Sequence, residues 1–257
     1  MKALWTGAIS FGLVNIPVKI YSATQDSNLD LDMLDKNDHA HIKYKRVNEN
    51  TGKEVANENI VKGFDYEGSL VVLETEDFEK ASAEKTDLIE IIEFVNSVEV
   101  NTMFYETPYY VEPQKSGSKA YALLRAALEE TKMAGLCTFI MRNKENLALI
   151  KTEGSVLVMN KIRFQEEIRK IEDLNLPGEK ETVKPAELKM AVALVKQLSA
   201  KFDLSKYKDN YSVNLLKLIK DKAQGKQVEA PKLRVTHSTK KDLIQQLQES
   251  LKIKKAS

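Results

Sequence analysis

The first clear pattern along the chain is an alternation of apolar and polar positions near its start. Within residues 5–22, one side of this alternation carries Val14, Ile16, Val18 and Ile20. Period-two spacing of β-branched residues predicts a half-buried strand. A secretory signal peptide would instead need an unbroken apolar core of about 7–15 residues, and glycine, asparagine, proline and lysine interrupt this one. Because Pro17 cannot donate a ladder hydrogen bond, we expect it at a sheet edge, a bulge or a strand end.

Further strands are predicted through the first two-thirds of the chain. Runs rich in β-formers and bounded by turn residues occupy 68–73, 87–95, 103–111, 136–142, 147–152 and 155–163. Residues 143–146, between two of these runs, are typical of a hairpin connection. Many short strands with few helices favour an α+β fold that is mainly β, built on a closed or partly closed antiparallel β-barrel.

Helical patterns are sparse in this part and dominate only after Leu176. A short helix is predicted to begin at Thr75, and a longer one spans 118–134 with Gly135 as its expected C-cap. Later helices are expected over 184–202, 206–223 and 238–251, with a linker at 224–235. The chain therefore divides into a barrel core at 1–183, a helical region at 184–223, and a linker with a last helix and a short basic tail at 224–257.

The last predicted helix carries a narrow apolar stripe. Leu243, Leu247 and Leu251 recur at i, i+4 and i+8, with Ile244 beside them. A short amphipathic helix beyond a linker cannot bury such a stripe by itself. The helix therefore either folds back on the rest of the chain or docks in a groove of a partner.

Composition is that of a folded protein. Of 257 residues, 42% are hydrophobic and 30% are charged, and no stretch approaches the roughly 18–20 apolar residues of a membrane span. Cys137 is the only cysteine, in an apolar context typical of a buried small side chain. Because no intrachain disulfide is possible and no signal peptide is expected, we expect a cytoplasmic protein.

The net charge of +1 conceals an asymmetry between the two parts of the chain. Residues 184–257 hold 17 Lys and Arg against 7 Asp and Glu, which leaves 22 basic and 31 acidic residues in 1–183. Such a split suggests an acidic folded body and a basic C-terminal part that binds a polyanion. Lysines that only solubilise exposed helices would produce the same composition, so both explanations stay open.

Residues that could support catalysis or bind a metal are few. The histidines are His39, His41 and His237, and on a strand the first two would project to one face as zinc ligands do. No cysteine cluster or third histidine lies nearby, so solvated histidines are favoured over a zinc site. Phosphate-binding loops, nucleophile elbows, HExxH motifs and dinucleotide-binding glycine patterns do not occur in the sequence. We therefore expect no catalytic residue, no metal and no cofactor.

Three groups of basic residues are candidates for binding nucleic acid. The candidate DNA-contact residues are Lys43, Lys45, Arg46, Lys115, Lys119, Arg142 and Lys144. The first three lie on a predicted strand at 42–47, the next two lead into the long predicted helix, where backbone N–H groups can also receive a phosphate, and the last two lie at the predicted hairpin. No recognition helix or aromatic RNA-binding strand accompanies them. We therefore expect contacts to the nucleic-acid backbone without sequence readout.

Several long segments together identify a family. They are WTGAISFGLVNIPVKIYSAT (5–24), IKYKRVNENTGKEV (42–55), IVKGFDYEGSLVVL (60–73), FYETPYYVEPQKSGSKAYALLRAALEET (104–131) and FIMRNKENLALIKTEGSVLVMNKIRF (139–164). In these segments, and in the helical stretches ALVKQLSAKFD and LLKLIKDKAQGK, the sequence closely resembles the bacterial Ku family. The likeness is collinear and covers nearly the whole chain.

The resemblance implies a non-catalytic protein that binds double-stranded DNA ends in non-homologous end joining. Members of the family are homodimers in which each β-barrel carries arm-like extensions, and the two subunits close a ring through which a duplex end threads. The ring contacts sugar and phosphate, and the C-terminal region docks a multifunctional ATP-dependent repair ligase. For this chain the resemblance implies a nucleoid-associated protein of the bacterial cytoplasm, with no membrane partner. Its expected ligase-docking positions are Leu243, Leu247 and Leu251.

This chain departs from the family pattern at two places, which changes what we expect of zinc binding and of the C-terminal tail. Some members carry Cys-x-x-Cys where this chain has Asn48-Glu49-Asn50-Thr51, so zinc is not expected there. The tail after Leu251 is also short beside the lysine-rich extensions of some relatives, which argues against a strong tail-driven affinity for internal DNA. From the residues alone, two rival classes stay open: a magnesium-dependent nuclease, which would cleave linear DNA, and a general nucleic-acid chaperone, which would bind closed circular DNA as well as linear DNA.

Overall fold

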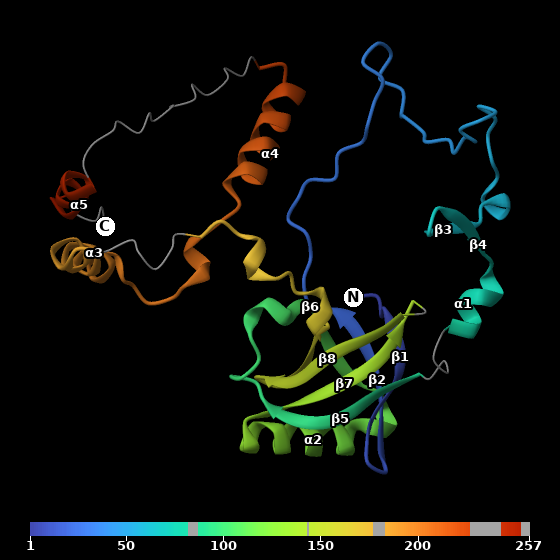
Figure 1. Ribbon diagram of the computed structural model, residues 1–257, viewed down its shortest axis with the longest axis horizontal. Coiled ribbons are helices and arrows are strands. Elements are labelled where there is room, and N and C mark those ends of the chain that lie inside the picture. The colour runs from blue at the N-terminus through green and yellow to red at the C-terminus, as the bar shows by residue number, and fades with distance from the viewer. Residues whose placement is uncertain (82–86, 143, 177–182, 227–242, 253–257) are drawn as a thin grey trace. The chain divides into compact units, whose positions relative to one another are not determined.

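A computed structural model describes residues 1–81, 87–142, 144–176, 183–226 and 243–252. The chain forms two compact units: Met1–Asp26 with Asp32–Lys170, and Ser27–Leu31 with Ile171–Ser257. The first unit holds a β-barrel and a long excursion between two of its strands, and the second holds the C-terminal helices (Figure 1). Within the described ranges, no helix combines the length and apolar character needed to cross a membrane.

Seven strands close into the barrel that the sequence predicts. They are β1 (Trp5–Phe11), β2 (Val14–Ser22), β5 (Leu88–Asn96), β6 (Tyr105–Pro113), β7 (Met133–Met141), β8 (Lys144–Glu153) and β9 (Val156–Ile162). Their order around the barrel is β1-β2-β6-β9-β8-β7-β5. Neighbours are antiparallel except β1 and β5, which run parallel with Ile9 opposite Ile89. The prediction of an antiparallel barrel is therefore wrong at one seam, because an odd number of strands cannot alternate in direction all the way around a closed barrel.

The apolar segment at the start of the chain supplies two neighbouring barrel strands, β1 and β2. Pro17 lies in the middle of β2, opposite Ala8 of β1. On its other side, the carbonyl of Pro17 accepts a hydrogen bond from the backbone N–H of Gln114 at 2.8 Å. The ladder between β2 and β6 stops beside it, at the pair of Val18 and Pro113. The missing N–H of Pro17 therefore falls where this ladder ends, and no ladder hydrogen bond is lost.

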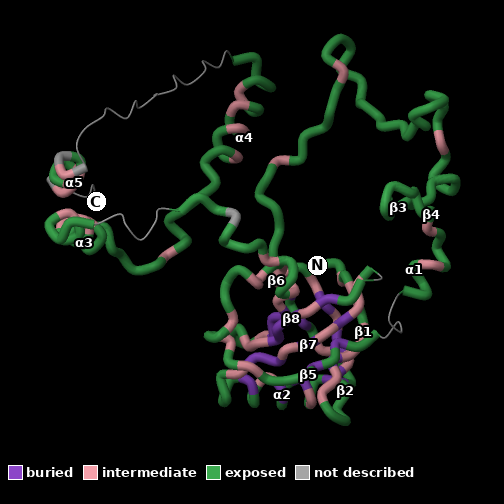
Figure 2. The backbone as a smooth tube through the Cα atoms, in the orientation of Figure 1, coloured by how far each residue is buried: buried purple, intermediate pink, exposed green. Residues whose placement is uncertain are grey.

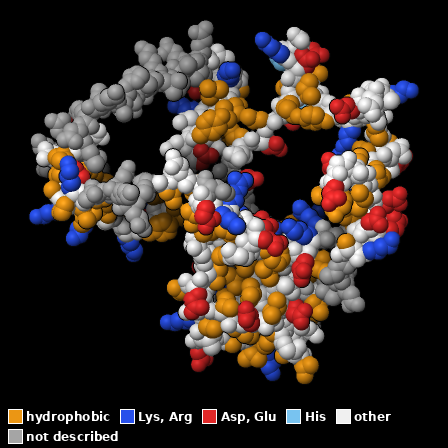
Figure 3. Space-filling view, in the orientation of Figure 1, with side chains coloured by type: hydrophobic (Ala, Val, Ile, Leu, Met, Phe, Trp, Pro, Cys, Tyr) orange, Lys and Arg blue, Asp and Glu red, His pale blue; other side chains and the backbone are white. Residues whose placement is uncertain are grey.

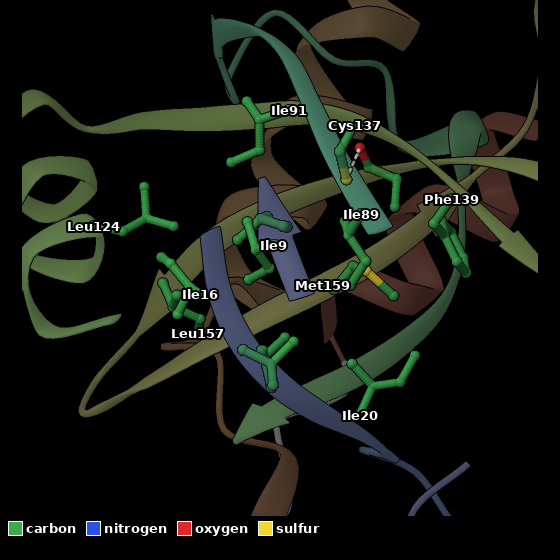
Figure 4. Close-up of a cluster of buried hydrophobic side chains, with 14 of the residues drawn as sticks. Ile9, Ile16, Ile20, Ile89, Ile91, Leu124, Cys137, Phe139, Leu157 and Met159 are labelled. Carbon is green, nitrogen blue, oxygen red and sulfur yellow. Dashed lines mark hydrogen bonds between the residues drawn. The ribbon is translucent and has the colours of Figure 1, made fainter. Parts of the chain in front are cut away.

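Alternate side chains of the strands fill the barrel interior (Figure 4). Fully buried members include Ile9, Ile16, Val18, Ile20, Ile89, Val111, Cys137, Ile150, Leu157 and Met159. The helix α2 (Ser118–Thr131) lies across the end of the barrel at which β6 and β8 finish and β7 and β9 begin, and it adds Tyr121, Leu124 and Leu128 to the same core. Burial raises the pKa of the Cys137 thiol to about 12, so this thiol stays neutral and unreactive in the folded protein.

The end of α2 differs from the sequence-based expectation. The helix stops at Thr131, and Lys132 takes the left-handed conformation at φ +56° that a C-terminal cap requires. Gly135 is not the cap, because it lies inside β7, opposite Phe94 of β5. A Cβ atom on Gly135 would stand 3.1 Å from the side chain of Ile91, so glycine lets β5 and β7 pack closely there without a shift of Ile91.

The buried hydroxyl of Tyr121 ties α2 to two barrel strands. It donates a hydrogen bond to the carbonyl of Val111 at 2.9 Å and accepts one from the backbone N–H of Leu157 at 2.7 Å. Both partners lie beside the barrel interior, where no solvent replaces a lost bond. The hydroxyl therefore satisfies two buried backbone groups at once.

Replacing Tyr121 by phenylalanine is expected to lower the free energy of unfolding by about 1–3 kcal/mol, because the N–H of Leu157 and the carbonyl of Val111 would be left buried and unpaired. Urea denaturation measures this loss. Tyr110→Phe, at a partly exposed position on β6, is the matched control and should change stability by less than about 0.5 kcal/mol. Equal stabilities of the two variants would contradict the role given to the Tyr121 hydroxyl.

Between β2 and β5 the chain forms an extended arm, defined here as residues 32–81 (Figure 2). The arm has two isolated bridges, Leu34 with His41 and Val47 with Glu54, then the hairpin of β3 (Lys62–Tyr66) and β4 (Ser69–Leu73), and the helix α1 (Thr75–Ala81). β4 and the start of α1 agree with the sequence patterns, whereas β3 lies in a stretch for which no strand was predicted. The predicted strand at 42–47 is wrong: within it only the last residue is paired, and the chain merely runs between the two bridges.

The second unit contains α3 (Pro185–Leu198), α4 (Asn210–Ala223) and α5 (Leu243–Lys252). α3 begins with proline in its first turn, as predicted. α4 begins four residues later than predicted, because the side chain of Asp209 caps it by accepting the N–H groups of Tyr211 and Ser212. α5 packs against α3. The predicted linker beyond residue 226, His237 and residues 253–257 of the tail lie outside the described residues.

Short 3-10 turns complete the secondary structure. They lie at Asn57–Asn59, Thr102–Phe104, Lys115–Gly117, Gln165–Glu167, Ile171–Asp173 and Leu204–Lys206.

Candidate nucleic-acid interface

Three of the basic candidates lie on the arm, which is exposed along nearly all of its length (Figure 2). Lys43, Lys45 and Arg46 are all exposed. The ammonium of Lys45 is 2.7 Å from a carboxylate oxygen of Glu54, which pairs with Val47 in the second bridge of the arm. An exposed pair of this kind contributes only about 0–1 kcal/mol, so a phosphate can replace the carboxylate at little cost.

Two further candidates lie at the turn between β7 and β8. Met141 pairs with Lys144, so the connection is shorter than the predicted 143–146, and Arg142 adopts a left-handed conformation at φ +55°. Asn146 lies within β8, where its buried amide donates to the carbonyl of Lys144. The side chains of Arg142 and Lys144 are exposed, and Lys144 stands 4.0 Å from Glu167.

Lys115 and Lys119 lie at the opposite end of the barrel. Both are exposed and flank the start of α2, where buried Gly117 packs closely on Pro17 of β2. β6, which leads to Lys115, runs antiparallel to β7, which leads to Arg142. The two pairs of candidates therefore emerge from different ends of the barrel. The arm leaves after β2 and returns before β5, which places its attachment at the end that carries Arg142 and Lys144.

A cavity of about 630 Å³ lies where the arm meets the turn between β7 and β8. Its lining includes Arg142 and Lys62 together with the acidic side chains Glu58, Glu74, Glu76 and Glu79. The carboxylates outnumber the basic groups, so this cavity does not suit a phosphate. Arg142 is the barrel residue that reaches it, and its charge is partly balanced there.

The exposed faces of the first unit carry both signs of charge (Figure 3). Lys161, for example, is 3.1 Å from Glu106, and Arg125 is 3.2 Å from Glu129. Of the ion pairs formed by described residues, none involves Lys43, Arg46, Lys115 or Lys119. The candidates on the arm other than Lys45, and the two at the start of α2, are therefore exposed and lie outside these ion pairs.

Two lysines on the outer barrel surface lie outside the candidate set. Lys19 of β2 lies opposite Glu112 of β6. Lys151 of β8 places its ammonium 5.8 Å from the ring centroid of Tyr105. Period-two alternation along each strand was the available signal, because the neighbours of both lysines point into the barrel.

The two histidines of the arm, His39 and His41, do not lie on a regular strand. His39 has a left-handed backbone at φ +58° in the turn closed by the bridge of Leu34 and His41, so the strand geometry that a zinc site of these two histidines would use does not occur. Over the part of the chain that the structure describes, no group of three or more His, Cys, Asp or Glu side chains is placed to hold a metal ion.

Comparisons with known proteins agree with this architecture. The family model described as "Ku70/Ku80 beta-barrel domain" matches residues 10–190. A protein of Opitutus terrae is 42% identical over 226 residues, covering 88% of this chain and 81% of its own length. A protein of Pseudomonas aeruginosa is 40% identical (89% and 79%), and one of Bacillus subtilis is 38% identical (88% and 74%). All three relatives carry the name "Non-homologous end joining protein Ku".

Proposed function

This chain belongs to the Ku β-barrel family, and we propose from this that it binds double-stranded DNA ends in non-homologous end joining. The single observation that carries the proposal is the collinear match of the barrel and most of the chain to relatives of that name. The proposed activity is non-catalytic: the protein holds the end, and other proteins act on it. The proposed setting is the bacterial cytoplasm, at the nucleoid.

The proposed binding unit is a ring-shaped homodimer. In support, both faces of the β3–β4 hairpin are exposed although they carry large apolar side chains. These are Phe64, Tyr66, Leu70, Val71 and Val72, each at least 45% exposed. An isolated two-stranded hairpin is at best marginally stable in water, and an apolar patch of this kind marks an interaction surface. A second copy of the chain that covers the hairpin would stabilise it and would remove its apolar side chains from water.

The proposed contacts with DNA are to phosphate and sugar, so binding is independent of sequence. The candidates are Lys43, Lys45 and Arg46 on the arm, Arg142 and Lys144 at the arm end of the barrel, and Lys115 and Lys119 at the α2 end. Exposed lysine and arginine side chains attract phosphate over short range, and binding them releases condensed counterions. The acidic excess elsewhere in residues 1–183 would repel DNA from surfaces outside the ring, which favours entry from an end.

The third part of the proposal is recruitment of an ATP-dependent repair ligase by α5. Leu247 and Leu251 lie on the half-buried side of this helix together with Ile244. The side chain of Leu243 lies outside the described residues. An amphipathic helix at the end of a linker can be presented to a groove of a larger protein while the barrel holds DNA.

Alanine at Leu243, Leu247 and Leu251 together is expected to abolish stimulation of the ligase while DNA-end binding stays unchanged, because these positions are remote in sequence from the barrel and arm. Ligation of linear DNA by the purified ligase and a gel-shift titration measure the two activities. Gln248→Ala, on the exposed side of α5, is the control and should behave like the wild type. Full ligase stimulation by the triple variant would remove these leucines from the docking site.

A further inference from the structure

The apolar side of α5 is already occupied in the folded chain. α5 packs against α3, and the two helices lie side by side (Figure 1). The half-buried positions of α5 are Ile244, Leu247, Ser250 and Leu251, while Gln246, Gln248 and Glu249 are exposed. Spacing of 3, 6 and 7 residues places the half-buried positions on one helical face. The side that α5 turns toward α3 is therefore its apolar side.

α3 has two apolar sides that differ in exposure. Met190, Ala191 and Leu194 are half-buried, at the spacing of one helical face. Leu188, Val192 and Val195 form a second stripe, and they are 54%, 43% and 67% exposed. The first of these two sides is the one that is covered. Because α5 is the helix that packs on α3, we assign the half-buried face of α3 to that contact.

We propose that α3 and the repair ligase compete for the same face of α5. This inference rests on the proposed docking of the ligase at Leu247 and Leu251, which are half-buried in the contact with α3. A helix cannot present one face to two partners at once, so ligase binding requires that α5 first leave α3. The apparent affinity for the ligase is then reduced by the fraction of molecules in which α5 is free.

The contact with α3 leaves the apolar side of α5 partly exposed, which suits a contact that forms and breaks reversibly. Leu247 and Leu251 remain intermediate in exposure although α5 packs against α3. In the sequence, 19 residues (224–242) separate the end of α4 from the start of α5, which is enough chain length for a released α5 to reach another partner. The resting state holds α5 on α3, and the ligase captures the released helix.

The contact itself is tested by the reactivity of a thiol in the full-length protein. Ser250→Cys places the probe on the half-buried side of α5, and buried Cys137 does not compete for the reagent because its pKa is about 12. Adding Leu194→Asp on the half-buried face of α3 should raise the labelling rate about tenfold, equivalent to about 1.4 kcal/mol of lost contact. Leu188→Asp, an identical substitution on the exposed face, should leave the rate unchanged. Equal rates in all backgrounds would overturn the contact and with it the proposal.

Competition is tested by titrating the purified ligase against the same chains without the thiol probe. Leu194→Asp should bind the ligase about tenfold more tightly than the wild type, and Leu188→Asp should match the wild type. Unchanged affinity for Leu194→Asp, together with loss of binding in the Leu247→Ala and Leu251→Ala double variant, would overturn competition but keep α5 as the docking helix. Unchanged affinity in all of these variants would overturn ligase docking at α5 and the competition that depends on it. Circular dichroism confirms that each variant retains its helices.

Discussion

Aspartate at Phe64 and Val71 together is expected to convert the protein into a folded monomer that no longer retains linear DNA. The two residues are directly opposite each other on β3 and β4, and they are 63% and 45% exposed in a single chain. In a two-fold interface the substitution removes four apolar side chains, because each subunit contributes the same surface. Covering about half of each side chain is worth about 3–6 kcal/mol in total, which corresponds to a loss in dimer affinity of about 10²–10⁴-fold.

Sedimentation at micromolar concentration and a gel-shift titration measure the two effects of this variant. Val98→Asp is the matched control, since Val98 is 88% exposed on the turn that follows β5 and lies outside the arm. The control should remain dimeric and bind DNA normally. A dimer that survives substitution of the hairpin would show that the subunits associate through another surface.

Reversing the charge of Lys43 and Arg46 is expected to lower the salt dependence of end binding as well as the affinity. Each phosphate contact contributes about 0.9 to the slope of log affinity against log salt, so two contacts in each of two subunits contribute about 3.6. The slope should fall by roughly that amount on substitution by glutamate. Lys45 is left in place, because its replacement by glutamate would set two carboxylates against each other at Glu54 and perturb the arm.

Two matched double reversals make the result specific. Lys2→Glu with Lys132→Glu changes the net charge equally at exposed positions outside the candidate set, and it should leave the slope close to that of the wild type. Lys115→Glu with Lys119→Glu tests the other end of the barrel. A reduced slope there would extend the DNA contact to the α2 end. If the arm variant shows the same salt slope as the wild type, Lys43 and Arg46 are excluded as phosphate contacts.

Most of the barrel could be predicted from the sequence, because side chains that point into the barrel are apolar and recur at every second position of a strand. The alternation of Ile16, Val18 and Ile20 recurs as three fully buried positions of β2. Alternation reports which side of a strand is buried but not the direction of its neighbour, so it could not reveal the parallel seam between β1 and β5. The position of Gly135 within β7 likewise depended on a packing contact with Ile91 from another strand.

The candidate site was less predictable, because exposed lysines are not constrained by packing. The densest basic stretch appeared to be a strand, yet residues 42–46 form no β-ladder and lie between the bridges of His41 and Val47. Nothing in the spacing of Lys115 and Arg142 indicated that they would emerge at opposite ends of the barrel. That separation follows from strand order, which is determined by contacts distant in sequence. The family was nevertheless evident from long segments that resemble it, such as the one at 5–24, which forms β1 and β2 of the barrel.

The apolar side of α5 shows a similar limit of prediction from the sequence. Its amphipathic pattern indicated that Leu247 and Leu251 needed a partner, and the structure supplies one in α3. α3 also carries a second apolar stripe, with Val192 and Val195, and this one is exposed. When a helix has apolar side chains on two sides, the periodicity of the sequence does not show which side is buried. Only tertiary contacts decide this.

The measurement that tests the central claim most directly is competition between linear and covalently closed plasmid of the same sequence for the purified protein at moderate salt. A ring that threads onto DNA requires a free end, so we predict that linear plasmid competes strongly and closed plasmid competes weakly, with the linear molecules remaining uncut in the presence of magnesium. Equal competition by the two forms would contradict end binding and favour a general nucleic-acid chaperone, and magnesium-dependent cleavage of the linear form would favour a nuclease.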